Sequence, residues 1–221
     1  MASLDDACLV CAECRRLLAC GGAPRCPRCA EPLVGDQLAA CRSCRERLPP
    51  FERAWALGEY SDGLRTAVLK IKQPSAEPLA AALADLLYQE RGVVIREWRP
   101  DAILPVPMHW FRRLARGANS AETLSSVLAK RLGAPHAAGC IFRRRRTRPQ
   151  SGLASGERFR NVRGAFRLRG GIDWAGARIL VVDDILTTGA TCGEISRLLL
   201  AAGVSATAAV VVARASDASP R

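Results

Sequence analysis

The chain has 221 residues, of which 49% are hydrophobic and 24% charged, enough for one folded domain with a small attachment; this composition excludes a disordered protein. Its 33 Lys and Arg residues outnumber 21 Asp and Glu residues, which gives a net charge of +12. Only three of these cations are lysines, so arginine carries almost all of the positive charge. Because a guanidinium group binds phosphate through two parallel hydrogen bonds, the composition favours a phosphate-bearing partner.

No run of residues approaches the roughly 20 apolar residues that a membrane span requires. The first residues, MASLDDACLV, are acidic and lack the basic and long apolar regions of a signal peptide. We therefore expect a cytoplasmic protein without a membrane span. In a reducing compartment, closely spaced cysteines indicate metal binding rather than a disulfide framework.

Eight of the ten cysteines lie within the first 44 residues. Two CxxC pairs, Cys26 with Cys29 and Cys41 with Cys44, are separated by eleven residues, and each pair can supply two corners of a tetrahedron around Zn²⁺. Four thiolates fill the coordination sphere, so the pattern predicts a structural zinc site, the alternative being free or redox-active thiols. A second zinc site could form from an earlier group with overlapping spacing: Cys8, Cys11, Cys14 and Cys20.

The pattern changes after Pro49 and Pro50, where residues 51–60 have the composition of a strand. We place a domain boundary there, between a zinc ribbon at 1–50 and a second domain at 51–221. Leucine-rich helical spacing predicts three amphipathic helices, around 79–87, 124–132 and 195–202. Continuous apolar runs predict strands that are covered on both faces, at 102–104, 179–182 and 208–213. These elements together predict an α/β domain with a parallel central sheet.

The second of these apolar runs leads directly into two carboxylates, Asp183 and Asp184, and then into a loop of small residues and a helix expected to begin near Thr191. The loop is Thr187-Thr188-Gly189-Ala190-Thr191. Successive N–H groups in such a loop form a concave nest, and the helix N-terminus adds partial positive charge, so the main chain can hold a phosphate. The adjacent carboxylates can accept hydrogen bonds from vicinal ribose hydroxyls. The pattern predicts a ribose phosphate site, whereas an acidic helix cap would explain only part of it.

This stretch resembles the fingerprint of the phosphoribosyltransferase family, a hydrophobic strand followed by two acids and a TTGAT-like loop. The resemblance implies a type I phosphoribosyltransferase fold that binds phosphoribosyl pyrophosphate (PRPP) with Mg²⁺. It further implies that Asp183 and Asp184 bind the ribose 2′ and 3′ hydroxyls. Residues 187–191 would then cradle the 5′-phosphate.

Three further stretches, together with the cysteine ribbon, narrow the resemblance to the ComF family of competence-associated proteins, in which a double zinc ribbon precedes a phosphoribosyltransferase domain. They are Leu104-Pro105-Val106-Pro107 with the basic residues after it, Arg148-Pro149-Gln150-Ser151-Gly152-Leu153, and 157–166. Residues 116–120 read Arg-Gly-Ala-Asn-Ser where the family usually has RGFNQ. The resemblance implies a role in natural competence and DNA uptake.

Phosphoribosyl transfer expels pyrophosphate from C1 of the ribose, so the site must neutralise a polyanionic leaving group with Mg²⁺ and cationic side chains. The candidates for pyrophosphate binding are Lys70, Lys72, Arg112, Arg113, Arg116 and Arg158.

Residues 140–170 hold ten arginines and a single acidic residue, a net charge of +9. This segment could be a mobile lid that brings cations to pyrophosphate, or a track for single-stranded DNA, or an ordinary solvated charge run. The candidate DNA contacts are Arg143, Arg144, Arg145, Arg146 and Arg148.

The sequence is therefore compatible with two alternative functions. The chain is a Mg²⁺-dependent phosphoribosyltransferase with an unidentified acceptor, or it is a non-catalytic sensor of PRPP or a nucleotide that binds single-stranded DNA and contacts competence-machinery proteins.

Overall fold

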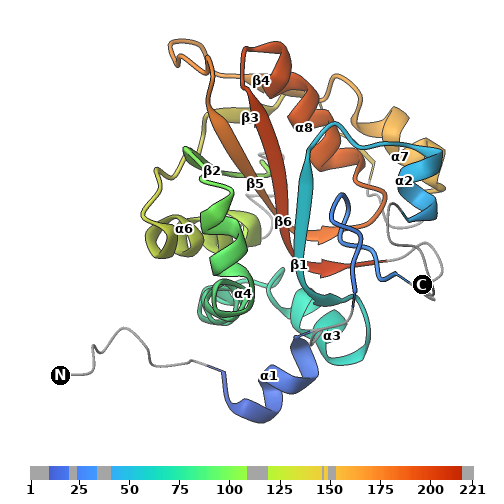
Figure 1. The fold of residues 1–221 in the computed structure, drawn as a ribbon, viewed down its shortest axis with the longest axis vertical. Helices are drawn as coiled ribbons and strands as arrows, with labels where there is room; N and C mark the ends of the chain where they lie inside the picture. The colour runs from blue at the N-terminus through green and yellow to red at the C-terminus, as the bar shows by residue number, and fades with distance from the viewer. Residues whose placement is uncertain are drawn as a thin grey trace.

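The computed structural model describes residues 10–19, 24–33, 41–108, 119–145, 147–148 and 153–215, and Figure 1 shows how their helices and strands are arranged. The helices described are α1 (Ala12–Leu18), α2 (Arg42–Glu46), α3 (Asp62–Lys70), α4 (Glu77–Glu97), α6 (Ser120–Leu132), α7 (Ser155–Val162) and α8 (Ala190–Ala201). The strands described are β1 (Arg53–Glu59), β2 (Ala102–Pro105), β3 (Ile141–Arg143), β4 (Phe166–Leu168), β5 (Arg178–Leu186) and β6 (Ala206–Arg214).

The central sheet contains four parallel strands in the order β1-β6-β5-β2. All nine residues of β6 are buried, as its continuous apolar sequence predicts for a strand covered on both faces. The pairing of β5 with β6 runs from Arg178 opposite Ala206 to Leu186 opposite Arg214. The predicted α/β architecture with a parallel sheet is therefore confirmed.

Helices cover both faces of this sheet (Figure 1), with α4 and α6 on one side and α8 on the other. Leu87 and Leu124 share one apolar cluster with Val210, while Ile195 packs with Val211 in the other cluster. Adjacent strand residues face opposite sides, so β6 contributes to both clusters. None of the helices in the described ranges has the length and apolar character needed to cross a bilayer.

The strands and helices predicted from residue 51 onward are all present, and α8 begins at Ala190, one residue before the predicted start. Three parts were not predicted: α3, α7 and the two-stranded antiparallel sheet in which β3 pairs with β4. This small sheet and α7 lie within the arginine-rich segment, so that segment is partly folded in this structure.

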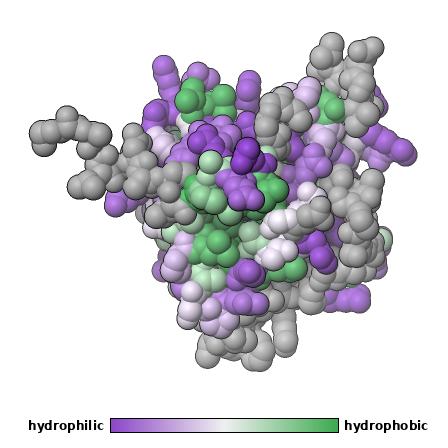
Figure 2. Space-filling view, turned by 90° about the horizontal axis from the view of Figure 1, so that it is seen from below, coloured by the Kyte–Doolittle hydropathy of each residue, from purple (hydrophilic) through white to green (hydrophobic). Residues whose placement is uncertain are grey.

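The N-terminal helix α1 packs closely on the domain that follows it. A Cβ atom on Gly58 would lie 2.3 Å from the carbonyl oxygen of Leu18, so only glycine permits this approach. Arg15 forms an ion pair with Glu90 of α4 at 2.7 Å. Leu17 is 71% exposed, and Figure 2 shows apolar surface surrounded by hydrophilic residues on the side where α1 and α3 lie.

The segments before and after residue 50 are in direct contact. The N–H of Ala54 donates to the carbonyl oxygen of Pro27 at 3.2 Å, and the Arg28 guanidinium donates to the carbonyl oxygens of Pro49 and Glu52, each at 3.3 Å. The cysteine-rich segment therefore packs against the start of β1. The boundary at residue 50 stays a prediction.

Candidate functional site

The acidic pair lies inside β5 rather than after it, because the strand continues to Leu186. The backbone N–H of Asp184 donates to Oδ1 of Asp183 at 2.9 Å. Lys72 reaches the pair from the turn after α3, and its Nζ lies 3.1 Å from Oδ2 of Asp184. Ser120, at the start of α6, donates to the same oxygen at 3.4 Å. Residues distant in sequence therefore converge on one carboxylate.

Asp183 has a strongly perturbed pKa. Burial, and secondly the neighbouring Asp184 carboxylate, raise the pKa of Asp183 to about 8, although the positive charges of Lys72 and Arg143 act in the opposite direction. At neutral pH the carboxyl group is therefore mostly protonated in the absence of a ligand. A cation bound beside it would favour the ionised form.

The loop after β5 leads into helix α8 through a left-handed glycine. Gly189 is the N-cap of α8 and adopts a left-handed conformation with φ of 75°, which glycine reaches without steric cost. The N–H of Ala190 donates to Oγ1 of Thr188 at 3.4 Å. Among the described residues, the N–H groups of Thr187, Thr188 and Gly189 have no hydrogen-bond acceptor. N–H groups without an acceptor, next to a helix N-terminus, are groups that can bind a phosphate.

The predicted pyrophosphate-binding cations are distributed unevenly around this site. Lys72 lies at the acidic pair, whereas Lys70 is exposed at the end of α3. Nε of Arg158 donates to the carbonyl oxygen of Leu153 at 3.0 Å, which ties that side chain to its own segment. Three of the candidates, Arg112, Arg113 and Arg116, lie outside the described residues.

The side chains of the consecutive arginines do not all point the same way and make different contacts. Arg143 lies on β3, where its guanidinium carbon is 4.9 Å from the centre of the Phe166 ring and its Nη1 donates to Oγ1 of Thr147 at 2.8 Å. Its positive charge also lowers the pKa of Asp183, so Arg143 acts on the acidic pair electrostatically. This role was missed, although the two-residue period of a strand places Arg143 on the same face as the buried Ile141.

The other candidate DNA contacts lie nearer the surface. Arg144 is exposed, and Arg145 donates to the carbonyl oxygens of Asn161 and Arg163 at 2.9 and 3.1 Å. Arg148 is exposed, and Asn161 holds its backbone through two hydrogen bonds. An open cavity of about 250 Å³ lies beside Arg148. Its lining residues are Arg148, Leu153, Glu157, Arg160 and Asn161. Arg146 lies outside the described residues.

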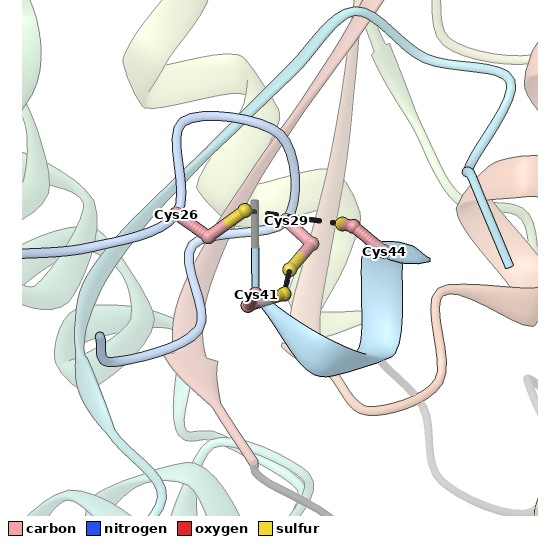
Figure 3. Close-up of side chains that lie close together, drawn as sticks. All are labelled: Cys26, Cys29, Cys41 and Cys44. Carbon is pink, nitrogen blue, oxygen red and sulfur yellow. Dashed lines mark hydrogen bonds between the residues drawn. The ribbon is translucent and has the colours of Figure 1, made fainter. Parts of the chain in front are cut away.

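The four cysteines of the two CxxC pairs form one buried cluster (Figure 3), to which Cys41 and Cys44 come from the start of α2 and from α2 itself. Their Sγ atoms all lie within 4.8 Å of one another, with 3.8 Å between Cys26 and Cys44 and 3.3 Å between Cys29 and Cys41. A tetrahedral zinc site with Zn–S bonds of about 2.3 Å needs sulfur atoms about 3.8 Å apart. The ligand number and spacing therefore fit a structural metal site.

Burial raises the pKa of Cys41 to about 12, and the neighbouring Cys29 adds to the rise. A thiolate at this position therefore needs a nearby cation, as metal coordination supplies. The earlier cysteine group is different: Cys11, the N-cap of α1, and Cys14, on α1, are exposed, and Cys8 and Cys20 lie outside the described residues. The second zinc site stays a prediction.

Comparison with known proteins agrees with this geometry. Residues 75–221 match the family model described as phosphoribosyl transferase domain. The chain therefore belongs to the phosphoribosyl transferase family.

Its relatives within the family have competence and DNA-utilisation names. It is 36% identical over 183 residues to the DNA utilization protein YhgH of Salmonella typhi, covering 81% of this chain and 79% of that protein. It is 32% identical to competence protein F of Haemophilus influenzae, covering 74% and 73%, and 26% identical to competence protein ComFC of Streptococcus pneumoniae, covering 90% and 84%. The resemblance to the ComF family is thereby confirmed.

Solved structures of lower similarity include adenine phosphoribosyltransferase from Leishmania tarentolae, with 19% identity and a TM-score of 0.37 over 69% of this chain and 73% of that one. Orotate phosphoribosyltransferase from Aeropyrum pernix has 20% identity and a TM-score of 0.36 over 61% and 59%. The assignment of the fold rests on the family match and on the observed parallel sheet.

Proposed function

We propose that this protein binds PRPP together with Mg²⁺ and acts in the cytoplasm in the uptake or utilisation of DNA. The observation that carries the proposal is the convergence of Asp183, Asp184 and Lys72 at the end of β5. Next to them lies a loop in which the N–H groups of residues 187–189 lack an acceptor among the described residues. The competence and DNA-utilisation names of the relatives support the cellular role.

In this proposal the loop at 187–191 holds the 5′-phosphate through its backbone N–H groups, and the two aspartates accept hydrogen bonds from the ribose hydroxyls. Lys72 pairs with Asp184, and the charge of Arg143 acts on Asp183; both cations would turn toward the pyrophosphate of the bound ligand. Mg²⁺ would neutralise that pyrophosphate and favour the ionised form of Asp183. The four-cysteine cluster would hold a structural zinc ion.

Isothermal titration with PRPP and Mg²⁺ tests the ligand. The wild-type protein should bind, and the Asp183→Asn/Asp184→Asn double variant should not, because amides cannot replace two charged acceptors. Asp173→Asn is the matched control, since Asp173 is exposed and its Oδ1 accepts from the nearby N–H of Ala175. Absence of binding by the wild-type protein would refute the site.

Catalysis and sensing are then separated by pyrophosphate release. An enzyme should release pyrophosphate from PRPP when an acceptor from a panel of nucleobases and amines is present, because the bond from C1 to the pyrophosphate oxygen breaks as the bond to the acceptor forms. Binding without release across the panel would favour the sensor.

Single-stranded DNA is the second proposed partner, supported by the exposed Arg144 and Arg148. Binding measured by fluorescence anisotropy should weaken steeply with salt, and each phosphate contact removed should reduce the slope of log K against log salt by about 0.7. Arg144→Ala/Arg148→Ala should therefore flatten the slope, whereas Arg143→Ala should weaken PRPP binding and leave the slope unchanged. Arg42→Ala, an exposed arginine on α2, is the control. If none of these variants changes the slope, the arginines do not bind DNA and are ordinary solvated surface residues.

A further inference from the structure

Arg214, the last residue of β6, is only 4% exposed. Its guanidinium contacts both the four-cysteine cluster and the start of the loop at 187–191, which we call the phosphate loop. Toward the loop, Nη1 donates to the carbonyl oxygens of Leu186 at 3.1 Å and Thr187 at 2.7 Å, and also to that of Ala215. Toward the cluster, Nε donates to the carbonyl oxygen of Cys29 at 2.8 Å, and Nη2 pairs with Oε2 of Glu31 at 2.9 Å. One buried side chain therefore joins two sites that are far apart in sequence.

The bonds to Leu186 and Thr187 orient the loop toward its ligand. In a planar trans peptide the C=O of one residue and the N–H of the next point in opposite directions. Because Arg214 holds the carbonyl oxygens of Leu186 and Thr187 on its own side, the N–H groups of Thr187 and Thr188 point away from it. These are two of the N–H groups that lack an acceptor among the described residues, so Arg214 positions donors that the phosphate would use.

The acceptors on the other side of Arg214 belong to the cysteine cluster. Oε2 of Glu31 lies 4.0 Å from Sγ of Cys29 and 3.7 Å from Sγ of Cys41, and the carbonyl oxygen of Glu31 accepts from the N–H of Cys26 at 2.8 Å. The positions of Glu31 and of the Cys29 carbonyl therefore depend on the order of the four-cysteine cluster. A cluster of this kind is ordered by its metal.

A second set of contacts connects the four-cysteine cluster with the phosphate loop. The ring of Phe51, which is fully buried, lies 3.5 Å from the position of a Cβ atom on Gly189, and Pro50 lies 3.2 Å from that position on Gly193. The cysteine segment holds this linker through the bond from Arg28 to Pro49. Packing and hydrogen bonding thus connect the cluster to the loop and to the first turn of α8.

We infer that Arg214 is a positioning residue that couples metal binding at the four cysteines to ligand binding at the phosphate loop. The inference rests on the proposed binding of PRPP. The cysteine segment is then more than a scaffold, because loss of its metal releases Glu31 and Cys29, loosens Arg214 and disorders the two N–H donors. Binding free energies at coupled sites are reciprocal, so PRPP must raise the affinity for zinc by the factor by which zinc raises the affinity for PRPP.

The test compares the zinc-loaded and zinc-stripped full-length protein. Zinc removal should raise the Kd for PRPP by a factor in the range of roughly 5 to 150 that is usual for coupled sites. It should also speed amide hydrogen exchange in residues 186–193, while exchange in α4 and α6 shows that the rest of the fold persists. The reciprocal measurement uses the loaded protein: PRPP should slow the transfer of zinc to a competing chelator.

Arg214→Met/Glu31→Ala removes this link without leaving a carboxylate unpaired. The ratio of its Kd values for PRPP without and with zinc should therefore fall well below that of wild type, and the contacts of Phe51 and Pro50 would carry the coupling that remains. A residue with a merely structural role would lower the melting temperature and leave this ratio unchanged. Arg131→Met is the matched control, since Arg131 pairs with Asp85 between α4 and α6 and should retain the full ratio. If the double variant does not fold, Glu31→Ala alone should reduce the ratio, and a ratio equal to wild type would overturn the inference.

The outcomes separate this inference from the proposed function. If wild-type protein binds PRPP with the same Kd with and without zinc, the coupling is wrong and the proposed ligand stands. If loaded wild-type protein does not bind PRPP, the proposed ligand is wrong and hydrogen exchange decides the coupling. Protection of residues 186–193 that depends on zinc, and depends on it less in the variant, supports the coupling; protection independent of zinc in the wild-type protein overturns it.

Discussion

The carboxyl group of Asp183 should destabilise the ligand-free protein at neutral pH, and Asp183→Asn should remove that cost. The pKa of Asp183 is about 8 in the folded protein, compared with an ordinary value of 3.8. Because the folded-state pKa lies above the unfolded one, the proton stabilises the fold fully below about pH 4, and this stability is lost as the pH rises to about 8. One pKa unit corresponds to about 1.4 kcal/mol, so roughly three units between pH 3.8 and pH 7 amount to about 4 kcal/mol.

Thermal unfolding of the ligand-free protein at pH 5, 7 and 8.5 measures this cost. For a chain of this size each kcal/mol shifts the melting temperature by about 2 to 4 °C, so Asp183→Asn should melt roughly 10 °C higher than wild type at pH 7, with a smaller difference at pH 5. Asp173→Asn, the exposed control, should show no such pH-dependent difference. The reasoning is refuted if Asp183→Asn is no more stable than wild type at pH 7, or if the difference does not grow with pH.

Three further predictions concern the same site and the metal. Binding of PRPP with Mg²⁺ at pH 7 should release nearly one proton from Asp183 and none at pH 9.5, as measured by titration in buffers of different ionisation enthalpy; equal release at both values would contradict the pKa of about 8. Gly189→Ala should cost about 1 to 2 kcal/mol in urea unfolding, because φ of 75° is unfavourable for alanine, and should weaken ligand binding. Gly133→Ala, with φ of 67° and open space around it, should cost a similar amount and leave binding intact; equal loss of binding in both would remove the loop from the site. Chelation of the zinc should unfold the cysteine segment, so the separate early unfolding of this segment should be absent from the unfolding curve of the stripped protein. About one zinc ion should be released per chain for a single four-cysteine site. A chain that holds no zinc would contradict the metal assignment.

The sequence predicted the sheet because its signals there are local. A continuous apolar run such as Val210-Val211-Val212 suits a strand buried on both faces, and the structure buries each of these residues. The two CxxC pairs likewise carry their ligand spacing within short segments. Helix α3 also has a local signal, since Leu64, Val68 and Ile71 keep helical spacing and are all buried, but the segment is short and was not recognised.

What could not be predicted depends on contacts between distant residues. Strands β3 and β4 have three residues each and pair only across α7, so neither has a periodicity of its own. The inward position of Arg143 follows from that pairing. The bond between Arg214 and Cys29 joins residues 185 positions apart, and a charged residue at the end of an apolar strand gives no sign of its partner.

The order of the sheet has a consequence for how the chain assembles. Among the strands that the structure describes, β1 pairs with β6 alone, so the first of these strands can join the sheet only after the last has been synthesised. The cysteine segment packs against β1 and against the final residue of β6, so it too can make these contacts only after β6 has been synthesised. Long-range pairing of this kind slows folding. We therefore expect the earliest part of the described chain to be the last to reach its native place, with β6 as the element that closes the molecule.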